Sequence, residues 1–258
     1  MSSVKAQAEA RFSQFAQQYV DSERHARGAE LARLVELAQP QNGWQMLDVA
    51  TGGGHMARTF APHVRQVIAT DLSLPMMRAA GQTVDAPNVE FVAADAENLA
   101  FADASFDLVT CRIAPHHFPD VFRFVTESVR VLKPGGTLLV QDLTVPDDER
   151  AARYVDSFYR LRDPSHQRCY AGYEWQGMLL DAGLTVTHTE AIEHVIGLAA
   201  WVEQQACSPY VVERLHLMLK QAPDRVREHL RSAAVGTPDA LYVQTHLIIQ
   251  GRSASSNS

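Results

Sequence analysis

Three aspartates follow short apolar runs at nearly equal spacing in the first half of the chain. They are Asp48 in QMLDVATGGG, Asp71 in VIATDLS and Asp95 in FVAADAENLAF, which are 23 and 24 residues apart. This spacing is about the length of one strand–helix unit, and the glycine cluster 52–54 follows the first aspartate. Carboxylates at the ends of parallel strands, with a Gly-rich turn after the first strand, are typical of a site that binds a nucleoside cofactor.

Two adjacent histidines follow the next apolar run, SFDLVTCR. His116 and His117 fall where a second reactant would lie, and histidine exchanges protons near neutral pH, so we consider either one a candidate base. The alternative is that they only pack and hydrogen-bond in the loop. Asp142, near the end of the fifth apolar run, is a further candidate for proton transfer, with a salt bridge as the alternative.

Aromatic and basic residues after position 150 are candidates for binding a second substrate. Tyr154, Phe158 and Arg162 have helical spacing and could wall a pocket, although an ordinary amphipathic helix has the same pattern. His166 lies in the loop RDPSHQR and could contact an anionic group, or could simply be solvated. The spacing His166-x-x-Cys169 lacks a second ligand pair, so we expect no metal site.

Strands and helices alternate from residue 45 to about residue 145. The expected strands are 45–50, 66–70, 89–93, 106–111 and 137–143. The expected helices are 54–62, 74–81, 119–132 and a short one near residue 98, preceded by two N-terminal helices at 4–20 and 22–39. This alternation predicts an α/β fold with a doubly wound, Rossmann-like parallel sheet and right-handed crossovers.

The pattern changes after residue 145. Helices dominate 146–182, and two alternating segments, LTVTHTEAIEH and LYVQTHLIIQG, predict late strands that bring the sheet to seven and add an antiparallel edge. We therefore divide the chain into an N-terminal helical lid (1–40), a cofactor-binding core (41–145), cap helices with the C-terminal strands (146–252) and a disordered tail (253–258).

Composition narrows the classes of function. The net charge of −7 argues against a nucleic-acid partner. Apolar runs are shorter than the roughly 20 residues of a membrane helix, and no secretory signal is apparent. Three scattered cysteines do not form a disulfide framework. We expect a cytoplasmic monomer or homodimer that acts on a small molecule.

The nucleoside cofactor could be of two kinds. The segment GGGHMA matches the dinucleotide pattern G-x-G-x-x-A, which is weak support for a nicotinamide dinucleotide. Asp48 and Asp95 argue against it, because carboxylates near the turn would repel a pyrophosphate but tolerate a cationic cofactor.

These motifs, in this order, resemble those of the class I S-adenosylmethionine-dependent methyltransferases, and specifically the ubiquinone/menaquinone C-methyltransferase-like (methyltransferase type 11) group. LDVATGGG resembles the first motif of this family, although Ala50 replaces the first glycine of G-x-G-x-G. The segments ATDLSLPMMRAA, ADAENLAFADASFDLV, HHFPDV and RVLKPGGTLLV resemble those that follow, so that residues 45–145 carry most of the likeness.

The resemblance implies roles for individual residues. Gly52 and Gly54 would let the backbone approach the amino-acid part of the cofactor, Asp71 would bind the ribose, and Asp95 with Ala96 would bind the adenine. The remaining cofactor contacts that it implies are Tyr19 and His25 from a lid, Leu72 and Met76 around the adenine, and Asp48, Ala50 and Arg112 at the methionine end.

The sequence thus predicts methyl transfer from S-adenosylmethionine to carbon or oxygen of a partly hydrophobic small molecule, with S-adenosylhomocysteine as the product. Two alternatives stay open. One is an NAD(P)-dependent oxidoreductase, and the other is a non-catalytic protein that binds a nucleoside cofactor.

Overall fold

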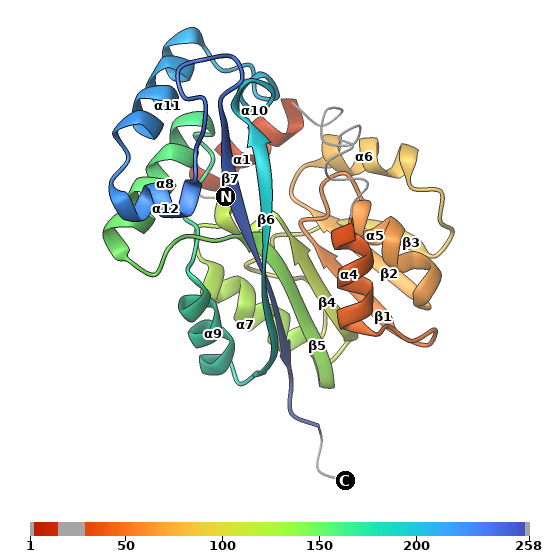
Figure 1. Cartoon of the computed structure of the whole chain (residues 1–258). Coiled ribbons are helices and arrows are strands. Elements are labelled where there is room, and N and C mark those ends of the chain that lie inside the picture. The colour runs from red at the N-terminus through yellow and green to blue at the C-terminus, as the bar shows by residue number, and fades with distance from the viewer. Residues whose placement is uncertain (1–2, 15–28, 256–258) are drawn as a thin grey trace.

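The computed structural model describes residues 3–14 and 29–255. Within these residues, seven strands form one sheet in the order β3-β2-β1-β4-β5-β7-β6 (Figure 1). Their bounds are β1 (Gln45–Val49), β2 (Gln66–Asp71), β3 (Val89–Ala93), β4 (Phe106–Arg112), β5 (Leu132–Leu143), β6 (Thr185–Gly197) and β7 (Leu241–Arg252).

Strands β1 to β5 pair in parallel, and β7 runs antiparallel to both of its neighbours, β5 and β6. This confirms the predicted doubly wound, mostly parallel sheet. The antiparallel strand lies one position in from the edge, because β7 inserts between β5 and β6. From β1 the chain proceeds to β2 and β3 on one side, and from β4 it proceeds to β5 on the other. The carboxyl ends of β1 and β4 therefore flank the switch point at which such sheets bind ligands.

Helices cover both faces of the sheet, and the side chains of the strands alternate between them. Met46 and Leu108 pack in the cluster formed with the helices α4 and α5, whereas their neighbours Leu47 and Val109 pack in the cluster formed with α7 and α9. The bounds of these helices are α4 (Ala29–Ala38), α5 (His55–Phe60), α7 (Val121–Val131) and α9 (Gly172–Asp181).

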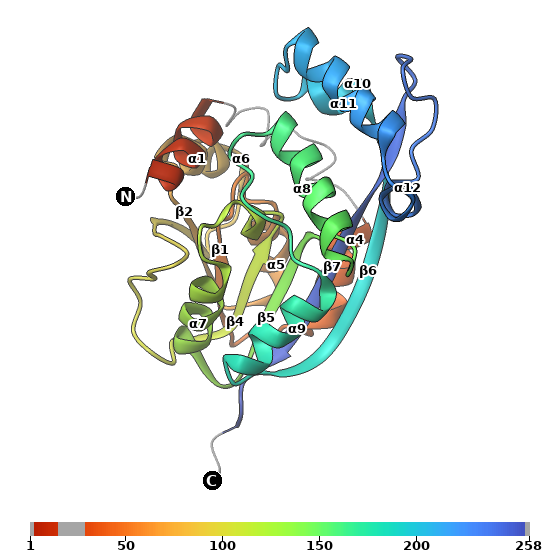
Figure 2. The same ribbon diagram turned by 90° about the vertical axis from the view of Figure 1, so that its left-hand side faces the viewer.

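A third core lies above the carboxyl ends of the central strands (Figure 2). It joins the helices α8 (Glu149–Arg162), α10 (Leu198–Glu203), α11 (Pro209–Gln221) and α12 (Asp224–Leu230). Phe158 stacks on Trp201 with ring centroids 5.4 Å apart, and Tyr242 of β7 meets both rings edge-on. Helix α1 (Ser3–Gln14) lies at the same end of the sheet, near α6 (Leu74–Thr83).

Side-chain caps set where several helices begin. The oxygens of Ser73, Asp120 and Asp148 accept hydrogen bonds from backbone N–H groups three residues ahead, at the starts of α6, α7 and α8. Such caps satisfy donors that the first turn of a helix leaves without intrahelical partners.

Some expected elements differ from the observed ones. The prediction of a short helix near residue 98 was wrong. Asp95 and Asn98 form an isolated bridge there, because the carboxylate of Asp95 accepts the N–H of Glu97 and closes a turn. Strand β5 begins at Leu132, five residues before the predicted start. The tail predicted to be disordered begins with order, since Ser253 N–H donates to the carbonyl of Gly136.

Candidate active site

The turn after β1 is held by the buried carboxylate of Asp48. Its two oxygens accept the hydroxyls of Thr51 (2.6 Å) and Thr110 (2.8 Å), which ties the turn to β4. These two hydrogen bonds fix the shape of the turn. Burial raises the pKa of Asp48 to about 6.

Three residues of this turn have left-handed backbone. Ala50 has φ +53°, Gly52 +53° and Gly54 +75°. A Cβ on Gly54 would lie 2.7 Å from Cγ2 of Val84, so this position needs glycine for space as well as for conformation. A Cβ on Gly52 would meet no atom within 4 Å, because the cavity opens there.

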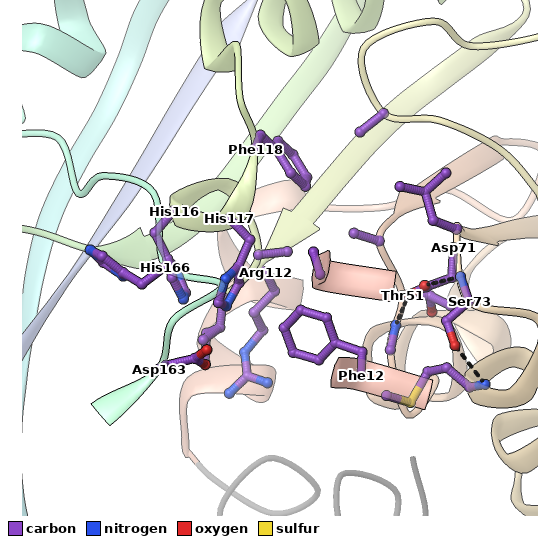
Figure 3. A pocket seen from close by; sticks show the side chains of 18 of the residues that line it. Phe12, Thr51, Asp71, Ser73, Arg112, His116, His117, Phe118, Asp163 and His166 are labelled. Carbon is purple, nitrogen blue, oxygen red and sulfur yellow. Dashed lines mark hydrogen bonds between the residues drawn. The ribbon is translucent and has the colours of Figure 1, made fainter. Parts of the chain in front are cut away.

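Asp71 lies at the end of β2 and faces the same turn. Its Oδ2 accepts the N–H of Gly52 (3.1 Å) and its Oδ1 accepts the N–H of Ser73 (2.9 Å), as Figure 3 shows. The backbone N–H of Leu72 also donates to this carboxylate, which still has a lone pair for a hydroxyl of a ligand. Burial raises the pKa of Asp71 despite these hydrogen bonds.

Asp95 is bound by helix α1. Nζ of Lys5 donates to both of its carboxylate oxygens (2.9 and 2.6 Å) and also lies 2.5 Å from Oε2 of Glu97. In this structure the carboxylate expected to read the adenine is therefore occupied by a lysine of the N-terminal segment.

Arg112 ends β4 and is tied to two elements. Its Nε donates to Oε1 of Gln141 (2.9 Å), and its Nη2 lies 3.5 Å from Oε2 of Glu30 in α4. The next residue, Ile113, has φ +52°, a strained conformation for a β-branched side chain. Strain of this kind is concentrated at functional sites.

Three histidines meet at the cavity. His116 lies beside Asp142, His166 lies beside Asp156, and His117 contacts Ser165. The ring of His116 lies 4.1 Å from that of His117 and 5.4 Å from that of His166. Asp142 accepts the backbone N–H of His116 (2.8 Å) and lies 2.6 Å from its Nδ1. Burial lowers the pKa of His116 to about 3 and raises that of Asp142 to about 7, so the ring of His116 is uncharged at neutral pH and Asp142 keeps its proton below about pH 7.

A single cavity connects the aspartates to the histidines (Figure 3). Of the predicted residues, it is lined by Asp48, Ala50, Gly52, Asp71, Leu72, Met76, Asp95, Ala96, Arg112, His116, His117, Arg162 and His166. Asp142 and Gly54 are not lining residues, but Asp142 contacts His116 and the N–H of Gly54 donates to the carbonyl of Thr51. Tyr19 and His25 fall outside the residues that the structure describes.

Two predicted substrate residues are not part of this lining. Phe158 is fully buried in the aromatic core with Trp201 and Tyr242. Tyr154 packs on the same core and donates its hydroxyl to the carbonyl of Met218 (2.8 Å). Neither side chain forms a wall of the cavity, because the apolar face of α8 turns toward the other cap helices.

Several lining residues were not predicted from the sequence. They come from α1, the loop after α8, α10 and β7, and include Phe12, Asp163, Trp201, Gln244 and His246. Only the loop RDPSHQR gave a signal, since it packs polar and ionisable residues into a short segment.

Two groups of potential metal ligands occur among the described residues, and in both the side chains already contact one another. Asp156 joins the pair His166 and Cys169, with its Oδ1 2.9 Å from Nε2 of His166. The other group is Glu30, His194 and His246, where Nε2 of His194 lies 3.0 Å from Glu30. Asp156 lies ten residues before His166, in α8, whereas Glu30, His194 and His246 come from three distant segments.

Known proteins are similar to this chain over most of its length. A methyltransferase-domain profile matches residues 47–140. The uncharacterized methyltransferase YcgJ of Bacillus subtilis (strain 168) is 34% identical over 220 residues, which are 84% of this chain and 87% of that protein. The crystal structure of the YcgJ protein matches with a TM-score of 0.84 at 30% identity, over 88% of this chain and 99% of that one.

Two further matches cover a shorter part of the chain or share the fold alone. The ubiquinone/menaquinone biosynthesis C-methyltransferase UbiE of Pseudomonas putida (strain GB-1) is 34% identical over 131 residues, 48% of this chain and 51% of that protein. A phosphoethanolamine N-methyltransferase 2 of Haemonchus contortus, solved with S-adenosylhomocysteine, shares the fold with a TM-score of 0.59 at 20% identity, over 88% of this chain and 53% of that one.

Within the described ranges, no helix combines the length and apolar character needed to cross a membrane. The fold, the strand-end aspartates and the similarity to YcgJ along most of both chains agree. The chain therefore belongs to the family of S-adenosylmethionine-dependent methyltransferases.

Proposed function

We propose that this protein transfers the methyl group of S-adenosylmethionine to a carbon or oxygen atom of a small, partly hydrophobic metabolite. The observation that carries the proposal is the continuity of one cavity from Asp71 and Asp95 to the histidines and the aromatic cap. A protein that only bound the nucleoside would need no second compartment. The net charge of −7 supports a small acceptor over a nucleic acid.

We call the part of the cavity lined by Gly52, Asp71 and Asp95 the nucleoside half, and the part lined by the histidines and the aromatic cap the acceptor half. The residues of the nucleoside half fit the cofactor. Gly52 leaves open space beside its α-carbon, and Asp71 keeps a lone pair for a ribose hydroxyl. Asp95 would accept the adenine amino group once Lys5 moves, with the N–H of Ala96 toward the ring. Leu72 and Met76 would enclose the adenine, and the backbone near Ala50, Gly54 and Arg112 would contact the methionine part.

The acceptor half combines aromatic and apolar side chains with histidines and other polar groups. Phe12, Phe118, Leu143, Tyr159 and Trp201 line it, which supports a partly hydrophobic and planar acceptor. The name of UbiE, a C-methyltransferase, favours carbon as the methylated atom.

The bound cofactor supplies a methyl group on a positively charged sulfur, so the protein has mainly to position the acceptor and exclude water. His117 is the better candidate for a base because it is half-buried at the cavity. His116 is fixed by Asp142 through both its backbone and its ring, and we assign this pair to holding the segment 115–117 in place.

The test is calorimetric titration of S-adenosylhomocysteine into the wild type and into Asp71→Ala. Loss of the charge-assisted hydrogen bond to the ribose predicts affinity lower by about 100-fold. Asp85→Ala removes an exposed carboxylate near the end of α6 and is the matched control, with unchanged affinity. Wild-type protein that does not bind the product would refute the proposal, and equal affinity in Asp71→Ala would refute the ribose assignment.

A further inference from the structure

The loop after α8 folds back onto His117. Ser165 Oγ lies 3.2 Å from Nδ1 of His117, although the two residues are 48 positions apart. Two further contacts hold this loop against the segment 115–117, since the N–H groups of Gln167 (2.8 Å) and Arg168 (3.2 Å) donate to the carbonyl of His116. These backbone hydrogen bonds hold Ser165 next to His117.

Asp163 determines which way the Ser165 hydroxyl points. Its Oδ1 accepts both the hydroxyl of Ser165 (2.6 Å) and the backbone N–H of the same residue (2.9 Å). Its Oδ2 accepts Nε2–H of Gln205 (2.7 Å), and Nε of Arg11 in α1 lies 3.2 Å from Oδ1. All four partners are donors, which is the environment of an ionised carboxylate.

The protonation state of Asp163 agrees with this geometry. Burial alone would raise its pKa, but the nearby His117 and the hydrogen bonds from Ser165 and Gln205 outweigh it and hold the pKa well below its ordinary value. An ionised carboxylate only accepts hydrogen bonds, so the single hydroxyl proton of Ser165 is committed to Asp163.

The hydrogen bond from Ser165 to Asp163 determines the tautomer of His117. With its proton directed to Asp163, Ser165 Oγ can only accept at Nδ1 of His117. Burial and the neighbouring His116 lower the pKa of His117 to about 3, so its ring carries one proton at neutral pH. That proton lies on Nδ1, and the lone pair lies on Nε2.

Two further rings pack against the imidazole of His117. Phe12 of α1 packs edge-on against the ring at 4.8 Å, and His116 packs against it on another side at 4.1 Å. Among the described residues, Ser165 is the hydrogen-bond partner of the His117 ring, and the side chain lines the cavity.

We propose that Asp163 and Ser165 are positioning residues that hold His117 as the Nδ1–H tautomer, so that Nε2 takes a proton from the acceptor. This inference rests on the proposed methyl transfer for its chemical purpose, although the tautomer itself can be measured without it. The pattern is a relay of carboxylate, hydroxyl and imidazole, in which the carboxylate orients the base and stabilises the imidazolium that forms.

The relay specifies the class of acceptor. A base is useful only if the acceptor has a weakly acidic O–H or C–H bond, as in a phenol, an enol or an activated methylene. The proton of that bond goes to Nε2, its electron pair forms the new bond to the methyl carbon, and the pair of the broken carbon–sulfur bond stays on sulfur as a neutral thioether. The imidazolium then returns the proton to water. An acceptor whose nucleophile carries no proton would not need the relay.

The test is ¹⁵N NMR of histidine-labelled protein at neutral pH, with the His117 signals assigned through their loss in His117→Gln. The wild type should show a protonated Nδ1 and an unprotonated Nε2 in His117. Ser165→Ala should give a mixture of tautomers, and Ser165→Thr, which keeps the hydroxyl, should restore the wild-type pattern. Ser157→Ala, an exposed serine of α8, is the control and should change nothing.

A protonated Nε2 in the wild type, or an unchanged tautomer in Ser165→Ala, would overturn the proposal. If Ser165→Ala does not fold, Asp163→Asn takes its place, because it keeps the volume but removes the charge that directs the hydroxyl. It should release the same tautomer mixture, and a single unchanged tautomer would count against the relay. Titration of S-adenosylhomocysteine into the same samples separates the two proposals: absence of binding refutes the methyltransferase function and leaves the tautomer result standing.

Discussion

The two halves of the cavity are built in different ways. In the nucleoside half, the carboxylates of Asp48 and Asp71 are bound by groups close in sequence or on adjoining strands, such as Thr51 and Ser73. In the acceptor half, each imidazole meets a partner from a separate element, as Ser165 meets His117. The strand-end turns of the first half are formed by the sheet itself. The second depends on α1, the cap and the loop after α8 coming together.

This difference predicts that changes in the two halves have separable effects. Substitutions at the strand-end turns should alter product binding and stability together. Substitutions in the acceptor half should alter proton chemistry while S-adenosylhomocysteine still binds.

The largest effect is expected for Gly54→Ala in the nucleoside half. A left-handed alanine and a contact of 2.7 Å with Val84 should lower the free energy of unfolding by about 2–4 kcal/mol. Urea denaturation measures this change, and product affinity should fall with it. Gly43→Ala is the control, because no atom lies within 4 Å of its added Cβ. Equal stability of the two variants would show that the turn is not rigid.

Asp142→Asn tests the acceptor half through the pH dependence of stability. In the folded protein Asp48 and Asp142 keep protons that the unfolded chain releases above pH ~4, since their pKa values are about 6 and about 7. His116 and His117, with pKa values of about 3, lack protons that the unfolded chain takes up below pH ~6.5. These four contributions nearly cancel around pH 5.

Asp142→Asn removes one of the two protons that the folded protein keeps and the unfolded chain releases. Its folded state then binds about one proton fewer than its unfolded state, so its free energy of unfolding should rise by about 1.4 kcal/mol per pH unit more steeply than that of the wild type between pH 5 and 6. Denaturation at the two pH values measures the slope, with the exposed Asp147→Asn as the control. Parallel slopes for Asp142→Asn and the wild type would mean that Asp142 is already ionised in the folded state.

Helix α1 touches both halves, and its two cations distinguish them. Lys5→Met should tighten binding of S-adenosylhomocysteine by about 2–5-fold, because Asp95 no longer has to release a partly exposed ion pair. Arg11→Met removes a cation from the same helix but at the side of Asp163, so affinity should stay near that of the wild type. Calorimetry measures both, and equal weakening in the two variants would mean that α1 acts only as a cover.

The smallest effect is expected for Ala50→Gly. Glycine relieves the left-handed strain but gains freedom in the unfolded chain, so stability should rise by about 0–1 kcal/mol. Ala104→Gly relieves a similar φ of +52° in an exposed turn and should leave product affinity unchanged. A change in affinity for Ala50→Gly alone would show that the methyl group of Ala50 contacts the cofactor. A marked loss of stability would contradict the assigned strain.

The strand ends that carry the aspartates could be predicted because their determinants are local. An apolar run that ends in an aspartate identifies a buried parallel strand, and the carboxyl ends of such strands meet at one edge. Asp48, Asp71 and Asp95 could therefore be placed before any contact was known.

The acceptor half was less predictable, for physical reasons. Helical spacing identified α8 but not which neighbour its apolar face would meet, so Phe158 was assigned to the cavity although it packs on Trp201. The pairing of Ser165 with His117 depends on a loop folding back over 48 residues, and no local pattern encodes that closure. His246 reaches the cavity only because β7 inserts between β5 and β6.

The position of β7 also has a consequence for synthesis. A chain made from its N-terminus exposes all the strands of the nucleoside half long before residues 241–252 leave the ribosome. Until β7 arrives, the edge of β5 is open and β6 has no strand to pair with. The emerging polypeptide should thus acquire its cofactor-binding turns early, and seal both its exposed sheet edge and its acceptor compartment in one late step.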